Sequence, residues 1–140
     1  MDHVVYLDYK SQELEKILSW EKNMLIRGAT WRKLPYWKVE LWDILYFINN
    51  NAEGLIKAKA TVSSIFNSEK MNENESKKLV NDNQNKLLLS NKQFQRFAWK
   101  RYIVLIEIKN IEEIKSFTID KSNYWNMDDW LLVKKIENVK

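Results

Sequence analysis

The stretch YIVLIEI at residues 102–108 has the strongest β-strand pattern in the chain. Apolar side chains fall on both of its faces, with Tyr102 and Val104 on one face and Ile103 and Leu105 on the other. Strands that are apolar on both faces lie inside a sheet and not at its edge. We therefore predict that this segment is a central strand of a sheet.

Further strands are predicted before this segment. Short apolar runs indicate strands at residues 4–7, 24–27 and 44–48, and the turn at 49–54, which contains Asn and Gly, joins the last of these to the next strand in a hairpin. That next strand alternates between apolar and polar residues, so one of its faces is expected to be buried. The residues expected on the buried face are Ile56, Ala58, Ala60, Val62 and Phe66.

After the central strand the pattern is weaker. The charged segment 112–115 is interpreted as a solvated turn. Phe117 and Ile119 alternate as in a strand, a turn is expected around 123–129, and a short apolar tail follows at 131–136.

Three short helices complete the prediction. Apolar residues spaced three and four apart predict a helix over 11–18, and segments that begin with capping-box pairs predict helices over 72–85 and 91–99. The two capping pairs are Asn72 with Glu75 and Ser90 with Gln93. Strands joined by hairpins and short helices indicate an α+β fold with a curved antiparallel or mixed sheet, or a small β-barrel. A chain of 140 residues is expected to form a single domain over residues 1–140.

The composition argues against several kinds of chemistry. Cysteine is absent, which excludes disulfides and thiolate metal sites. The single histidine, His3, has no cluster of carboxylates at ligand spacing around it and is interpreted as an unremarkable terminal residue. Two isolated glycines, Gly28 and Gly54, cannot form a phosphate-binding loop. We therefore expect no metal, no nucleotide cofactor and no Ser-His-Asp triad.

Charge and hydropathy bear on where the protein works. No apolar run is long enough to span a bilayer, and the N-terminus lacks a signal-peptide pattern, so we expect no membrane partner. The absence of cysteine predicts a cytoplasmic location. Against 19 acidic residues there are 23 basic ones, and the formal net charge is +4. This balance favours polyanionic partners.

Aromatic and basic side chains alternate in several loops. Aromatic rings stack on bases for about 1–3 kcal/mol each, and Lys and Arg neutralise phosphates, so the pattern is typical of a surface for single-stranded nucleic acid. The groups are Trp20 with Lys22, Trp31 with Arg32 and Lys33, Tyr36 and Trp37 with Lys38, and Trp99 with Lys100, Arg101 and Tyr102. The loop at 28–39, which holds the only proline, is a candidate functional surface. The alternative is that the tryptophans form no stacking surface.

Seven tryptophans and only two glycines are an unusual combination for a chain of 140 residues. Six of the tryptophans fall in turn-like surroundings, where glycine is favoured because a left-handed backbone costs it no Cβ clash. A left-handed backbone at a tryptophan destabilises the fold by about 1–2 kcal/mol, and the turn exposes its large ring to water. The six are Trp20, Trp31, Trp37, Trp42, Trp99 and Trp125.

Several segments together resemble an ASCH domain of the PUA-like superfamily, and the resemblance covers almost the whole chain. It rests on LSWEK at 18–22 with IRG at 26–28, RKLPY at 32–36, DILYF at 43–47, FNSEK at 66–70, KRY at 100–102 and NMDDW at 126–130. The family motif is a glycine, any residue, a lysine, four residues and an arginine. Lys22 and Arg27 occupy its basic positions, while Trp20 stands where the family has its glycine.

Similar family members carry glycine at the other five tryptophans as well, whereas Trp130 matches a tryptophan. We hypothesise that the six codons are UGA, which some bacterial lineages translate as glycine and others as tryptophan. The abundance of Lys, Asn and Ile fits an AT-rich genome. If the chain does contain tryptophan at these six positions, we predict strained turns, exposed rings and a lower stability than that of the six-fold Trp→Gly variant.

The resemblance implies a PUA-like small β-barrel with flanking short helices. It also implies a cleft that binds RNA or a nucleoside, with the motif lysine and arginine at its floor. Some ASCH proteins cleave single-stranded RNA, and others are amidohydrolases that deacetylate N4-acetylcytidine. Asn23 stands where the amidohydrolase pattern has threonine, which counts against deacetylation.

Three functional hypotheses follow. In the first, the protein is an RNA-binding module, and the residues expected to contact RNA are Lys22, Arg27, Arg32, Lys33, Tyr36, Lys100, Arg101, Tyr124 and Trp130. In the second, the cleft is an enzyme site in which Lys22 is the general base and a carboxylate, Asp43 or Asp128, orients the nucleophile. In the third, Lys22 and Arg27 are only structural partners of surface carboxylates.

Overall fold

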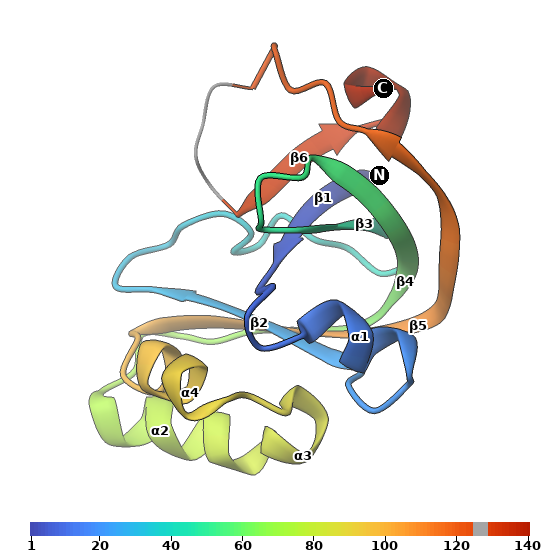
Figure 1. Ribbon diagram of the computed structural model, residues 1–140. Coiled ribbons are helices and arrows are strands. Elements are labelled where there is room, and N and C mark those ends of the chain that lie inside the picture. Colours follow the sequence, from blue (N-terminus) through green and yellow to red (C-terminus); the bar gives the residue numbers. More distant parts are fainter. Residues whose placement is uncertain (125–128) are drawn as a thin grey trace.

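A computed structural model of the protein describes residues 1–124 and 129–140. Six strands form one curved sheet, and three short helices lie together below it, with a fourth against its concave side (Figure 1). The elements are β1 (Asp2–Leu7), α1 (Glu13–Leu18), β2 (Met24–Ala29), β3 (Ile44–Asn49), β4 (Leu55–Asn67), α2 (Glu73–Asp82), α3 (Gln84–Leu87), α4 (Asn91–Phe97), β5 (Tyr102–Thr118), β6 (Trp130–Lys134) and the 3₁₀ helix η1 (Ile136–Val139).

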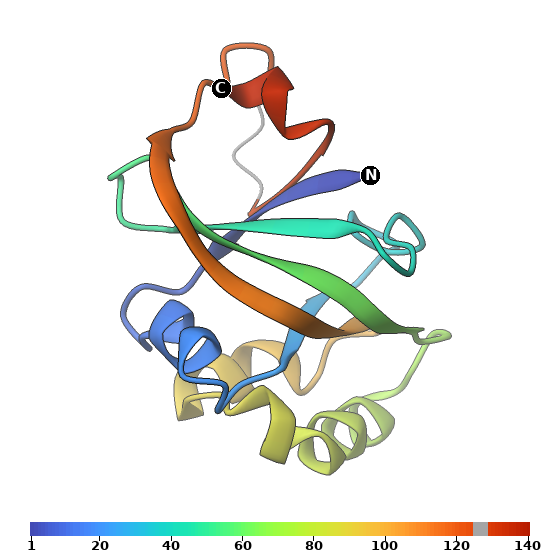
Figure 2. The ribbon, with the colours of Figure 1, turned by 90° about the vertical axis from the view of Figure 1, so that its right-hand side faces the viewer.

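The sheet is mixed and curls into a half-barrel, as the two views in Figures 1 and 2 show. The strand order is β2-β5-β4-β3-β1-β6, in which only the β1–β3 pair is parallel. The strand predicted to be central, now β5, lies between β2 and β4. The predicted α+β fold with a curved mixed sheet is therefore confirmed, as is the hairpin between β3 and β4.

Side chains of β2 and β5 alternate between two clusters. Leu25 and Val104 pack inside the half-barrel, whereas Ile26 and Ile103 pack under helices α2 to α4. Because side chains two positions apart on a strand share a face, Arg27 is directed to the same concave side as Leu25. The fold thus places one motif cation inside the curve of the sheet.

Both helices that were predicted from capping-box pairs begin with a complete capping box. Asn72 and Glu75 form a complete capping box at the start of α2, and Ser90 and Gln93 form another at the start of α4. The helix predicted over 72–85 is divided, because α2 ends at Asp82 and α3 begins at Gln84. None of the helices in the described part of the chain is both long and apolar enough to cross a bilayer.

Two strand predictions were wrong in detail. Phe66 was expected on the buried face of β4, but it is exposed, because a register shift between Val62 and Ser64 reverses the alternation and brings Ile65 toward the core. The segment 112–115 is not a turn: it lies within β5, which extends to Thr118 and pairs with β4. The charged side chains of this segment are exposed, so this part of β5 faces solvent.

Three of the suspect tryptophans have a left-handed backbone. The φ angles of Trp20, Trp37 and Trp42 are 67°, 57° and 73°. Trp20 directly follows Ser19, the C-cap of α1, at the position where glycine most often ends a helix. Trp37 and Trp42 each occupy the third position of a four-residue turn, closed by the bonds from Lys38 N–H to Pro35 and from Asp43 N–H to Glu40. A positive φ at that position calls for glycine.

Exposure separates the same tryptophans from Trp130. Five suspect rings lie in the described residues, and their exposed fractions are 62% for Trp20, 61% for Trp31, 71% for Trp37, 67% for Trp42 and 46% for Trp99. Trp130 is 1% exposed. Trp31 and Trp99 have no left-handed backbone, and Trp125 lies outside the described residues. Exposed rings are therefore found at all five described positions, and strained turns at three of them.

Candidate functional site

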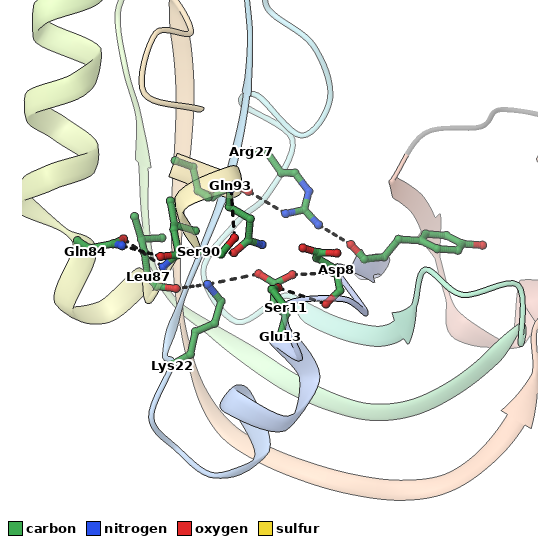
Figure 3. Close-up of polar contacts among 12 residues, drawn as sticks. Asp8, Ser11, Glu13, Lys22, Arg27, Gln84, Leu87, Ser90 and Gln93 are labelled. Carbon is green, nitrogen blue, oxygen red and sulfur yellow. Dashed lines mark hydrogen bonds and ion pairs between the residues drawn. The ribbon is translucent and has the colours of Figure 1, made fainter. Parts of the chain in front are cut away.

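Arg27 bridges the open side of the half-barrel. From the edge strand β2, its Nη2 donates to the carbonyl of Tyr6 in β1 at 2.7 Å, and its Nη1 donates to the carbonyl of Ile26 at 2.7 Å (Figure 3). Its Nε lies 3.1 Å from Oδ2 of Asp129, just before β6, and its guanidinium stands 5.6 Å from the centre of the Trp130 ring. Because Arg27 is only 8% exposed, most of its donors serve the protein itself.

Two hollows meet at this arginine, and together they form one cleft. Both are lined by Arg27, Asn50, Arg96, Phe97 and Asp129. The first, which we call the loop hollow, has a volume of about 220 Å³ and continues over the 31–36 loop to Tyr102. The second, the helix hollow, has a volume of about 660 Å³ and continues between α1 and α4, past Asp8, Glu13 and Gln93. The larger volume is in the range of small-molecule sites.

Cations concentrate at the loop hollow. Arg27, Lys33 and Arg96 line it, and Asp129 is the only carboxylate among its described lining residues. Lys100 lies beside the hollow, packed against Gly28, which lines it. A Cβ on Gly28 would be only 3.2 Å from the Lys100 side chain, so the glycine makes room for this lysine. Burial, and then the positive charges of Arg96 and Lys33, lower the pKa of Lys100.

Aromatic rings form another part of the same wall. Tyr36 and Tyr102 line the loop hollow with their ring centres 5.5 Å apart, and the Tyr36 hydroxyl donates to the carbonyl of Ser68. Arg32, outside the hollow, lies with its guanidinium 5.7 Å from the centre of the Tyr102 ring. Trp31 also lines this hollow. Rings beside cations are the two components of a surface that binds single-stranded nucleic acid.

Lys22, the motif lysine, is placed behind the cleft and not in it. It is 1% exposed, its Nζ lies 3.3 Å from Oε2 of Glu13, and the same Nζ donates to the carbonyl of Leu87 (Figure 3). Burial lowers the pKa of its amine, against the opposing effect of Glu13. Of this pair, Glu13 lines the helix hollow and Lys22 lines neither hollow. The Glu13 carboxylate therefore lies between Lys22 and the helix hollow.

Asp43 belongs to a separate buried network. His3 is fully buried and not the unremarkable terminal residue expected from the sequence. The indole N–H of Trp130, which can only donate, bonds to His3 Nδ1 at 3.0 Å, so His3 Nε2 carries the proton and donates to Asp43 Oδ2 at 2.8 Å. Burial lowers the pKa of His3, against the opposing effect of Asp43, and so favours the neutral ring. For Asp43, burial opposes ionisation, but hydrogen bonds from the Glu40 N–H and from His3 outweigh it and lower the pKa.

The remaining sequence candidates are dispersed. Trp130 is enclosed in the core, which leaves no face of its ring for a base. Tyr124 packs against the apolar cluster near η1, and Arg101 is exposed but lines neither hollow. Asp128 lies outside the described residues. Across residues 1–124 and 129–140, no group of three His, Cys, Asp or Glu side chains could hold a metal ion.

Sequence reasoning missed Arg96, Asp129 and Glu13. Arg96 is in the last turn of α4, where a basic residue has an ordinary role near the helix C-terminus. Asp129 directly precedes Trp130, the tryptophan that matches the family. Glu13 is in the first turn of α1, where an acidic residue is also ordinary. No local pattern marks these residues, because the strands and helices that bring them together are far apart in the sequence.

The structure resembles solved structures of one protein over nearly its whole length. Two single-substitution variants of the ASCH protein from Zymomonas mobilis both align with a TM-score of 0.71, at 13% and 14% identity, and the alignments cover 97% of this chain and 92% and 90% of theirs. The unsubstituted ASCH protein aligns with a TM-score of 0.68 at 14% identity, over 98% of this chain and 92% of that one. The sequence itself matches no family model and no curated protein significantly.

The chain therefore has the same fold as the ASCH protein from Zymomonas mobilis. The resemblance in the sequence is confirmed at the level of the fold, because the identities of 13–14% speak for the arrangement of the chain and not for a shared activity.

Proposed function

We propose that the protein is an RNA-binding module whose site is the loop hollow and its rim. The observation that carries this proposal is the meeting of Arg27, Lys33 and Arg96 with the rings of Tyr36 and Tyr102 on one concave surface. Cations neutralise phosphates, and rings stack on bases without regard to sequence. Lys100 and Arg32 lie close enough to extend the positive surface to a neighbouring phosphate.

In this proposal, Lys22 has a different role from the one implied by the family motif, whereas Arg27 keeps its place in the cleft. Both are paired with carboxylates, Lys22 with Glu13 and Arg27 with Asp129, and both are buried. The Lys22–Glu13 pair maintains the shape of the cleft, whereas Arg27 and the other cations that line the loop hollow provide the attraction for RNA. The third hypothesis, in which the motif cations are structural, is thus kept for Lys22 and combined with the first.

An enzyme site built on Lys22 and Asp43 has little support in the geometry. Lys22 is behind Glu13, and Asp43 is bonded to His3 in a network that lines neither hollow. A general base must come within hydrogen-bond reach of the proton it removes. Catalytic turnover is therefore tested in the binding experiment and is not part of the proposal.

Binding of a labelled single-stranded oligouridylate of about twelve nucleotides tests the proposal. If Arg27, Lys33 and Arg96 each contact one phosphate, a plot of the logarithm of affinity against the logarithm of salt concentration should have a slope of about −2. The Arg96→Gln variant should bind about three- to tenfold more weakly and lose about 0.7 of that slope. Fluorescence anisotropy at several salt concentrations provides both quantities.

Arg101→Gln is the matched control, because it removes the same charge from an exposed arginine that lines neither hollow. It should keep the slope and most of the affinity. A flat salt response, or equal losses in the two variants, would refute binding at this cleft. Incubation with the same RNA and with N4-acetylcytidine checks for products: turnover that disappears in Lys22→Ala would favour the enzyme hypothesis.

A further inference from the structure

The carboxylate of Asp129 lies where an RNA phosphate would be attracted. It is the one acidic side chain among the described residues that line the loop hollow, and it also lines the helix hollow. Its Oδ2 is 3.1 Å from Arg27 Nε and 3.9 Å from Arg96 Nη2. Arginine binds carboxylates and phosphates through the same planar array of donors, so one group can take the place of the other.

The hydrogen bonding at this position is incomplete. Although Asp129 is close to Arg27 Nε, that nitrogen is one of the few buried side-chain atoms in the described residues without a hydrogen-bond partner in suitable geometry. The carboxylate thus neutralises Arg27 without satisfying its N–H. A buried donor left in this state is costly, and an oxygen placed in line with the N–H would remove that cost.

The surroundings allow the side chain to leave without the backbone. The Tyr6 N–H donates to the Asp129 carbonyl at 2.9 Å, and the next residue, Trp130, is in β6 and buried. Arg27 is likewise held by the carbonyls of Tyr6 and Ile26. Asp129 itself is one-third exposed, and the Arg96 side chain is 64% exposed. Among the described residues, rotation of the Asp129 and Arg96 side chains is enough for an incoming anion to replace the carboxylate.

We infer that Asp129 is an internal substitute for a ligand phosphate: its carboxylate occupies an anion site between Arg27 and Arg96 and is displaced when a phosphate binds there. This inference rests on the proposed function and adds to it the position of one phosphate. It also assigns Asp129 an inhibitory role, because its charge competes with the ligand for both arginines.

The Asp129→Asn variant tests this role. Asparagine keeps the size of the side chain and the backbone carbonyl that Tyr6 contacts, but it removes the competing charge. We expect this variant to bind the oligouridylate about fivefold or more tightly than the wild type. Asp82→Asn is the matched control: it also frees a cation, Lys78, but on the exposed surface of α2 and not in either hollow. It should bind within about twofold of the wild type.

A double-mutant cycle locates the effect. In the Arg96→Gln background, Asp129→Asn should give a smaller gain, because the anion site has already lost its second cation. Urea unfolding of each variant checks that it is folded. Equal affinities of the wild type and Asp129→Asn, or weaker binding by Asp129→Asn, would overturn the inference while leaving RNA binding intact.

Inorganic phosphate separates this inference from the proposed function. A bound anion raises the unfolding midpoint according to its affinity. If no variant binds RNA, the RNA proposal fails, and the inference still predicts greater stabilisation by phosphate in Asp129→Asn than in the wild type and Asp82→Asn. Equal stabilisation of the three proteins by phosphate would then overturn the inference as well.

Discussion

Trp130 in β6 and the tryptophans of the turns have the same side chain in opposite relations to the fold. Trp130 packs inside the half-barrel, donates from its indole N–H to His3 and has the Arg27 guanidinium over its ring, with 1% of its surface exposed. Trp20, Trp37 and Trp42 project into solvent from a left-handed backbone. The first position needs a large ring with a donor, whereas the other three need a residue without a Cβ.

This contrast shows where the fold depends on a side chain and where it depends on the backbone alone. In the core, the ring and its hydrogen bond determine stability, and the backbone is that of an ordinary strand. In the turns, the φ angle determines which residue fits, and the ring contributes strain and exposed apolar surface.

The largest expected effect comes from Trp130→Ala. Removing a buried Trp ring costs about 3–5 kcal/mol, and here it also leaves His3 without its donor. Urea unfolding followed by circular dichroism measures the loss. A decrease in the free energy of unfolding of less than about 1 kcal/mol would show that the Trp130 ring stabilises the protein no more than an exposed ring does. That result would contradict the difference drawn between Trp130 and the tryptophans of the turns.

The triple variant Trp20→Gly, Trp37→Gly and Trp42→Gly should be more stable than the parent protein. Relief of left-handed strain is worth about 1–2 kcal/mol per site, and the greater freedom of glycine in the unfolded chain offsets part of it, so we expect a net gain of about 2–3 kcal/mol. Urea unfolding again measures it, with the midpoint moving to higher urea.

The double variant Trp31→Gly and Trp99→Gly is the control, because these residues have exposed rings without a left-handed backbone. It should gain clearly less per site than the triple variant. A triple variant no more stable than the parent would contradict the strain argument. The codon hypothesis has its own check in the same gene: six UGG codons would end it, whereas six UGA codons beside a UGG for Trp130 would support it.

The smallest expected effect is the pH dependence contributed by His3. Its pKa in the folded protein is below the ordinary value of 6.5, so below that pH the unfolded chain binds a proton that the folded protein does not. Stability should therefore fall as the pH drops below 6.5, by at most about 1.4 kcal/mol per pH unit, until the folded-state pKa is reached.

NMR can follow this titration directly, because His3 is the only histidine in the chain. Its imidazole signals should titrate below pH 6.5 in the parent protein. In Trp130→Phe the indole donor is absent, so Nδ1 can accept a proton more readily and the midpoint should move upward. A midpoint at or above 6.5 in the parent would show that His3 is not held neutral by the core.

Local patterns accounted for the elements but not for their lengths and breaks. Short apolar runs located β1 to β3, alternation located β4, and the capping pairs at Asn72 and Ser90 located α2 and α4. The register shift after Val62 and the extension of β5 through 112–115 escaped prediction, because both depend on how β4 pairs with β5. Strand pairing is a property of two distant segments, and one segment carries no record of it.

The candidate site was harder to predict than the fold. The loop at 28–39 was identified and contributes Lys33 and Tyr36 to the loop hollow. Lys22 was expected at the floor of the cleft, but its amine is buried behind Glu13. Charge and spacing show that a cation is present, whereas its exposure depends on which neighbours the fold supplies.

The sequence by itself determined the strand and helix pattern, the positive charge and the unsuitability of tryptophan in the turns, since each follows from local periodicity, composition or the φ that a turn requires. Only the tertiary structure decided that Arg27, Arg96 and Asp129 meet, that Lys22 is buried and that His3 bonds to Trp130 and Asp43. These contacts join residues up to 127 positions apart, as in the His3–Trp130 bond, and the curvature of the whole sheet is needed to form them.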